Sequence, residues 1–229
     1  LYNGVAKYDG KGFKVPNHYN SAAGIQTYRT GPDNSLDNFC TLSGIQTNSP
    51  STILSSGALR VDSGANSGVA YGTVGIPTTG KWYFETHIDE DSGSKSNHIG
   101  IQAEALPEYT SAYRVLLRED GNVYGDSSAG QLGTAGWSVA PNDVVGVQVD
   151  SDAGKVYFWK NGGSQTSAWD IFNFGFANPR GSESYRAYFL GGDGTGATFN
   201  FGQDCTFRGQ KTGTFNKDAN GIGEFLYSV

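Results

Sequence analysis

The 229-residue chain has no methionine, two cysteines, seven prolines and only 17% charged residues. Cys40 and Cys205 lie far apart and lack the paired spacing of zinc ligands, so they do not predict a metal site. Two small buried thiols are the favoured interpretation. Their redox state stays open, because counting cysteines does not settle it.

No apolar run approaches the ~20 residues that a membrane-spanning helix needs, and no signal peptide opens the chain. We therefore expect no membrane insertion. The lack of a methionine at position 1 and the apolar run at residues 225–229 lead us to expect a processed chain or part of a longer one.

The formal net charge of −6 is unevenly distributed along the chain. Residues 1–60 carry five basic and three acidic side chains, whereas residues 61–229 carry 11 basic and 19 acidic ones. Because an acidic body repels phosphate backbones, we predict no nucleic-acid partner. A solvated arm is the favoured interpretation of the basic opening segment, and contact with an acidic neighbour is the alternative.

What the chain does have is 34 glycines and 13% aromatic residues, which suit many short strands joined by tight turns. The strongest pattern runs from residue 143 to residue 162. A β-branched run at 144–149 leads into a polar turn ending at Gly154, and an apolar strand follows at 155–160. This pattern predicts a hairpin whose first strand is covered on both faces, with the rest of the chain packed around it.

Residues 82–89 alternate regularly, which predicts a half-buried antiparallel strand. Its two faces contain Trp82, Phe84, Thr86 and Ile88 on the buried side, and Tyr83, Glu85, His87 and Asp89 on the solvent side. Further strands are predicted at residues 53–61 (a hairpin), 69–75, 99–102, 113–117, 123–125, 185–190 and 197–201.

Strands separated by turns, without intervening helices, predict an all-β fold, a two-layer antiparallel β-sandwich. The side chains expected to be almost fully buried between the layers are Phe84, Ile101, Val147, Phe158 and Phe201. Residues 1–40, with at most two short strands at 5–8 and 25–29, predict an extended arm. The sandwich is expected at 41–203, and an irregular C-terminal extension at 204–229.

Four stretches together resemble the SPRY domain family, a concanavalin-A-like jelly roll. They are residues 80–85 (Gly-Lys-Trp-Tyr-Phe-Glu), 99–101 (Ile-Gly-Ile), 144–162, and 188–190 (Tyr-Phe-Leu) leading to 199–202 (Phe-Asn-Phe-Gly). One departure is Phe84, where the family usually has tryptophan. The resemblance implies a binding module in which variable loops at one edge of the sandwich hold a protein or peptide, without catalysis.

The flanks at residues 37–42, 200–203 and 218–225 resemble SPRY-bearing proteins of tailed bacteriophages. This resemblance implies a virion surface or tail-fibre module for structural display and for adhesion to a host glycan or protein. Two alternatives stay open: a purely architectural subunit of a fibre or capsid decoration, and an extracellular lectin-like protein of cellular origin.

Candidate catalytic groups are weak, so we predict no enzyme and no catalytic residue. The nearest candidate for a carboxylate pair is the run Asp89-Glu90-Asp91. It lacks the paired pattern of glycan hydrolases, and it is interpreted as a solvated loop at the end of a strand. His87 and His98 have no third metal ligand nearby in sequence and are interpreted as surface histidines. The nucleophile-elbow pattern is absent.

No cofactor or metal is predicted either. Asp150 and Asp152 are explained by the hairpin turn, since a Ca²⁺ site wants about six or more oxygens. The glycine-rich loop at 191–196 lacks the lysine and the helix of a phosphate-binding loop.

Aromatic residues in polar loops favour a binding role, because flat amphipathic rings stack on sugars or anchor protein contacts. The candidate ligand-binding residues are Tyr109, Tyr113, Trp137, Trp169, Tyr185 and Asp193. The alternative for Trp137 and Trp169 is that they close the ends of the sandwich. Alternation also turns Tyr157 and Trp159 away from the core. We expect this face to be covered by the N-terminal arm or by a neighbouring subunit, which predicts an assembly contact with other virion subunits and a homo-oligomer.

Overall fold

The computed structural model describes residues 7–8, 13–14, 39–43, 52–64, 68–90, 97–103, 114–125, 130–171, 185–219 and 223–228. Every regular element within these ranges is a β-strand, and none of them contains a helix that could cross a membrane. The strand expected at 25–29 and two candidate residues, Tyr109 and Tyr113, lie outside the described residues. The strand expected at 5–8 is seen as β1 (Lys7–Tyr8), which pairs with β2 (Phe13–Lys14).

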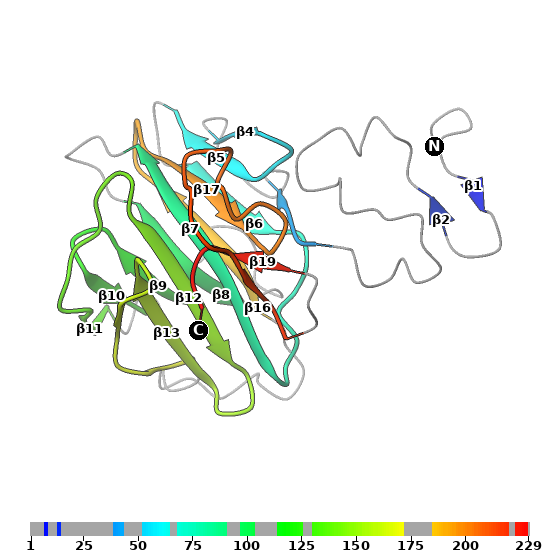
Figure 1. Cartoon of the computed structure of the whole chain (residues 1–229). Helices are drawn as coiled ribbons and strands as arrows, with labels where there is room; N and C mark the ends of the chain where they lie inside the picture. Colours follow the sequence, from blue (N-terminus) through cyan, green and yellow to red (C-terminus); the bar gives the residue numbers. More distant parts are fainter. Residues whose placement is uncertain are drawn as a thin grey trace.

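Two antiparallel sheets face each other (Figure 1), which confirms the predicted sandwich. The seven-stranded sheet has the order β11 (Gln131–Thr134), β10 (Asn122–Tyr124), β9 (Arg114–Arg118), β8 (His98–Ala103), β16 (Tyr185–Gly191), β6 (Gly68–Gly72) and β3 (Leu42–Ser43). The eight-stranded sheet has the order β14 (Ser164–Gln165), β13 (Lys155–Lys160), β12 (Val144–Asp150), β7 (Lys81–Glu90), β17 (Gly196–Asn200), β5 (Arg60–Ser63) and β4 (Thr52–Ser55), with β15 (Trp169–Asp170) also paired to β13.

The core lies between the sheets and contains four of the five side chains expected there. Phe84, Ile101, Val147 and Phe158 are buried. Phe201 is the exception, since it is only partly buried at the margin of the core. It follows the last residue of β17, and its ring packs 5.8 Å from that of the fully buried Phe199.

The predicted hairpin is the centre of the eight-stranded sheet. β12 pairs with β13 on one side and with β7 on the other. Gly154 closes the turn with φ +64°, a left-handed conformation that glycine adopts without steric cost. Val144, Val145, Val147 and Val149 are all buried, so β12 is covered on both faces, as its sequence indicates.

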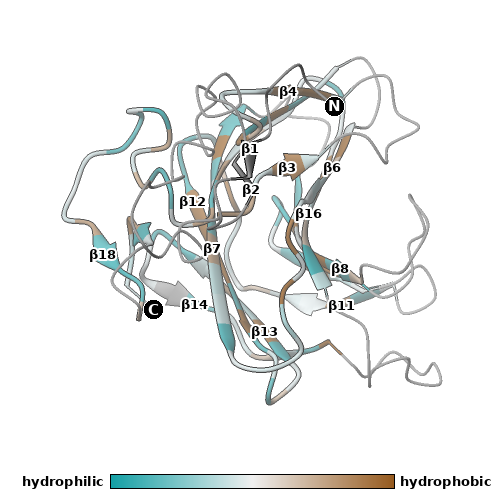
Figure 2. Cartoon of the chain, turned by 90° about the vertical axis from the view of Figure 1, so that its right-hand side faces the viewer, coloured by the Kyte–Doolittle hydropathy of each residue, from teal (hydrophilic) through white to brown (hydrophobic). Residues whose placement is uncertain are grey.

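A third layer covers the outer face of the eight-stranded sheet. It consists of residues 204–219 and 223–228, here called the C-terminal cover, and includes the small hairpin of β18 (Asn216–Lys217) and β19 (Glu224–Phe225). Figure 2 shows it on the side of β7 and β12 that faces away from the other sheet. Phe207 and Leu226 pack with Val144, and the ring of Phe225 lies 5.1 Å from that of Tyr83.

Candidate functional site

The outward face of β7 is buried, contrary to the half-buried strand that its alternation predicts. Glu85 and His87 have no exposed surface, and the Asp89 side chain is 4% exposed. Alternation correctly sorts the residues onto two faces, but it does not say what lies above each face. Here the C-terminal cover lies above the polar one.

Glu85 is the anchor of this cover. Its carboxylate accepts hydrogen bonds from the backbone N–H groups of Leu226 (2.9 Å) and Tyr227 (2.8 Å). The Asn200 amide (3.1 Å) and the Tyr83 hydroxyl (3.2 Å) donate two more. Burial raises the pKa of Glu85 above its ordinary value, and these four donors oppose that rise.

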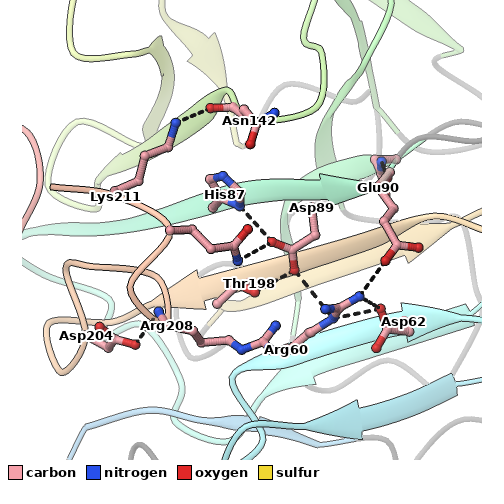
Figure 3. Close-up of polar contacts among 12 residues, drawn as sticks. Arg60, Asp62, His87, Asp89, Glu90, Asn142, Thr198, Asp204, Arg208 and Lys211 are labelled. Carbon is pink, nitrogen blue, oxygen red and sulfur yellow. Dashed lines mark hydrogen bonds and ion pairs between the residues drawn. The ribbon is translucent and has the colours of Figure 1, made fainter.

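Asp89 is the second anchor, shown in Figure 3. It accepts hydrogen bonds from the Thr198 hydroxyl (2.6 Å) and from the Gln210 amide of the C-terminal cover (2.8 Å). Its other neighbours are the His87 Nδ1 atom at 2.7 Å and the Arg60 Nε atom at 3.5 Å. Burial alone would raise the pKa of Asp89, but the hydrogen bonds outweigh it and hold the pKa below its ordinary value.

The pair of His87 and Asp89 has the geometry of a base and the carboxylate that orients it. However, His87 is fully buried, its ring lies 5.7 Å from that of Phe207, and its Nε2 atom has no hydrogen-bond partner. A base closed off in this way cannot reach a substrate, so we assign the pair to holding the C-terminal cover. The expectation of a surface histidine is therefore wrong for His87, while His98 is partly buried in the opposite sheet, 6.0 Å from the Tyr124 ring.

The acidic loop of the sequence is divided between two environments. Glu90 is exposed and forms an ion pair with Arg60 at 2.8 Å, and Asp91 lies outside the described residues. Asp89, grouped with them by sequence, belongs to the buried network instead.

The candidate ligand-binding residues that the structure describes lie at two opposite ends of the sandwich. Trp169 pairs with Val156 at the start of β13, and Tyr185 starts β16. Trp137 lies at the other end, with its carbonyl group against Gly121, and Asp193 follows the end of β16 at that same end. They therefore do not form one site.

Trp137, Trp169 and Tyr185 are partly buried and pack against the core, as the alternative of closing the sandwich ends expects for the two tryptophans. The Trp169 ring is so close to β11 that a Cβ atom at Gly133 would lie 2.6 Å from it. Asp193 is partly exposed in the loop between β16 and β17.

Tyr157 and Trp159 are partly buried on the outer face of the eight-stranded sheet, and the Trp159 indole donates a hydrogen bond to Gln148 (3.2 Å). On the same outer face, the C-terminal cover packs over the neighbouring strands β12 and β7. Whether a second subunit adds to the covering of the two rings stays a prediction.

Sequence analysis missed Trp82. Alternation assigns it to the buried side with Phe84, but it lies beyond the core and is 42% exposed. Its indole N–H donates to the Thr79 carbonyl group (2.8 Å), and the preceding Gly80 N–H donates to Asp152 in the central hairpin turn (2.9 Å). Hydrogen bonds therefore hold both the Trp82 ring and the backbone that precedes it.

The segment before Trp82 is also fixed to the hairpin turn. The Ser151 hydroxyl donates to the Pro77 carbonyl group (2.8 Å), and the Ser151 N–H donates to Gly80 (2.9 Å). The same connection between β6 and β7 contains Val74, which is 45% exposed. This end of the sandwich thus presents apolar side chains on a well-supported backbone.

A model of the SPRY domain family matches residues 81–204, which is more than half of the chain. The chain belongs to the SPRY domain family. Its members are protein-binding modules. Among solved structures, the SPRY domain of human HERC1 matches with a TM-score of 0.50 and 16% sequence identity, covering 65% of this chain and 91% of that chain. The TRIM65 PSpry domain matches with a TM-score of 0.51 and 13% identity, covering 70% and 91%. These similarities show the fold alone, and a comparison with curated proteins gives no match.

Proposed function

We propose that this SPRY domain is a non-enzymatic protein-binding module whose binding surface is the end of the sandwich around Trp82. The observation that carries the proposal is the exposure of the Trp82 ring on a backbone held by the central hairpin turn. A large ring that is fixed before binding loses little conformational freedom in a complex, and tryptophan is enriched among residues that dominate binding energy.

The charges around Trp82 complete this surface. Lys81 forms an ion pair with Asp150 at 3.3 Å, and Lys155 forms one with Asp170. All four groups lie at the ends of strands of the eight-stranded sheet. An apolar centre with paired charges at its rim is the usual organisation of a protein interface.

For the wider setting, we propose a module on a virion surface, for display and for adhesion to a host protein or glycan. This rests on the resemblance of the stretches at 37–42, 200–203 and 218–225 to SPRY-bearing proteins of tailed bacteriophages. In the same setting, Tyr157 and Trp159 are the assembly contact with other subunits. An architectural fibre or capsid subunit and an extracellular lectin-like protein are the competing functions.

Protein and glycan arrays, screened with the full chain, separate these functions. Binding to proteins that is lost in Trp82→Ala supports the proposal. The matched control is Ile53→Ala, which removes a 57% exposed side chain from β4 at the sheet edge and should leave binding intact. Binding to glycans alone favours the lectin-like function, and a lack of binding to either favours the architectural one.

A further inference from the structure

The contact between Glu85 and the C-terminal cover has the chemistry of a peptide-binding site. A buried carboxylate accepts two successive backbone N–H groups, from Leu226 and Tyr227. Asn200 donates through one amide group both to Glu85 (3.1 Å) and to the Glu224 carbonyl group (2.9 Å). The sheet therefore recognises the main chain of residues 224–227 through side chains of its own, and such recognition does not depend on covalent connection.

The site is also shaped to hold this segment. A Cβ atom at Gly162 would lie 2.3 Å from the Tyr227 ring, and one at Gly202 would lie 3.0 Å from Gly223. These two glycines, both in the left-handed region, leave the space that the segment occupies. Phe225 and Leu226 are each only 8% exposed, so their side chains fill the site.

The C-terminal cover consists of two docked parts joined by an exposed connection. The first part is held by Phe207, by the hydrogen bond from Gln210 to Asp89, and by a bond from Lys211 to the Asn142 carbonyl group. The second part, residues 216–219 and 223–228, is held at Glu85. All four residues between them, 212–215, are exposed.

We propose that the outer face of β7, β12 and β17 is a peptide-binding site, that residues 223–228 are its ligand within one chain, and that the same residues of a second copy occupy it in an exchanged dimer. Exchange of an identical element keeps every contact of the site, so it is an energetically cheap route to a dimer. The exposed connection at 212–215 is the hinge at which the two arrangements diverge.

The peptide-binding site is tested with the full chain carrying Phe225→Ala and Leu226→Ala, which weakens the internal ligand. The probe is a fluorescent peptide of residues 216–228, measured by polarisation. The peptide should bind this variant and not the native chain, in which the tethered segment competes at high effective concentration.

Methylated peptides identify the contact. Methylation of the Tyr227 backbone nitrogen removes one hydrogen bond to a charged group and should weaken binding by about tenfold or more. Methylation at exposed Ser228 is the matched control and should change binding by less than about twofold. Equal binding of the unmodified peptide and the two methylated peptides, or no binding of any of the three, would overturn the proposed site.

The exchanged dimer is tested with a variant that keeps every residue of the site. Deleting Gly213 and Thr214 shortens the hinge, so the second part of the cover can no longer fold back easily onto its own sheet. Light scattering should then detect a dimer, and adding Glu85→Gln should weaken that dimer, because the substitution replaces one acceptor oxygen with a donor. A deletion variant that stays monomeric, or whose dimer is unaffected by Glu85→Gln, would overturn the exchange.

Discussion

Replacing Phe207 with alanine tests whether the C-terminal cover is a structural layer of the domain or only an attachment to it. Phe207 is fully buried, packs with Val144 and Leu226, and shields the His87 ring. A side chain of this size, surrounded by both the sheet and the cover, cannot be removed without leaving a cavity.

The expected cost follows from this burial. Phenylalanine-to-alanine substitutions at buried sites cost about 3–5 kcal/mol, which is a large part of the roughly 5–15 kcal/mol that stabilises a typical domain. Urea unfolding followed by tryptophan fluorescence measures the change. Hydrogen exchange should show faster exchange in β7 and β12 as well as in the cover.

The matched control is Phe215→Ala in the same segment. Phe215 is 38% exposed in the connection between the two parts of the cover, so its removal should change the unfolding free energy by less than about 0.5 kcal/mol. A change below about 1 kcal/mol for Phe207→Ala, with unaltered exchange in β12, would refute the third layer.

Three further predictions concern the core and the two buried carboxylates. Phe158→Ala should cost about 3–5 kcal/mol in urea unfolding, and Phe201→Ala should cost less because Phe201 is partly exposed. The pKa of Asp89 is lower in the folded state than its ordinary value of 3.8, so the ionised side chain stabilises the fold above pH 3.8. The stability advantage of the native chain over Asp89→Asn should therefore disappear as the pH falls through the lowered pKa. Burial raises the pKa of Glu85, so its pH dependence is opposite: the stabilisation linked to its protonation is fully present below 4.5, and the advantage over Glu85→Gln should shrink, without changing the four hydrogen bonds to the carboxylate, as the pH rises through the raised pKa. Unfolding curves for both pairs from about pH 3 to about pH 8 check the two directions, and parallel pH profiles would contradict them.

The fold was predictable because its signals are local. The turn that ends at Gly154 and the alternation of residues 155–160 specify the central hairpin within about twenty residues of sequence, as short-range hairpin signals do. The hairpin and the strands around it, with no predicted helices between them, are enough to predict the antiparallel sandwich.

The third layer was not predictable, because it depends on contacts between distant parts of the chain. Glu85 receives hydrogen bonds from Leu226 and Tyr227, which are more than 140 positions away in the sequence. Nothing in the alternation of β7 indicates that its polar face is covered, and the glycine-rich sequence after residue 203 does not show that it docks.

For the proposed binding surface, the sequence indicates only a type of residue. Aromatic side chains in polar loops include those that close the sandwich, such as Trp169, and those that face solvent, such as Trp82. The sequence places both next to turns, and only the packing of the core distinguishes them.

The most direct test of the proposed binding surface is the affinity of the full chain for the protein partner found on the array, compared with the Trp82→Ala and Ile53→Ala variants. An interface anchor contributes about 2 kcal/mol or more, so Trp82→Ala should weaken binding by about 30-fold or more while Ile53→Ala changes it by less than about twofold. Equal affinities of the native chain and Trp82→Ala would contradict the assignment of binding to this end of the sandwich.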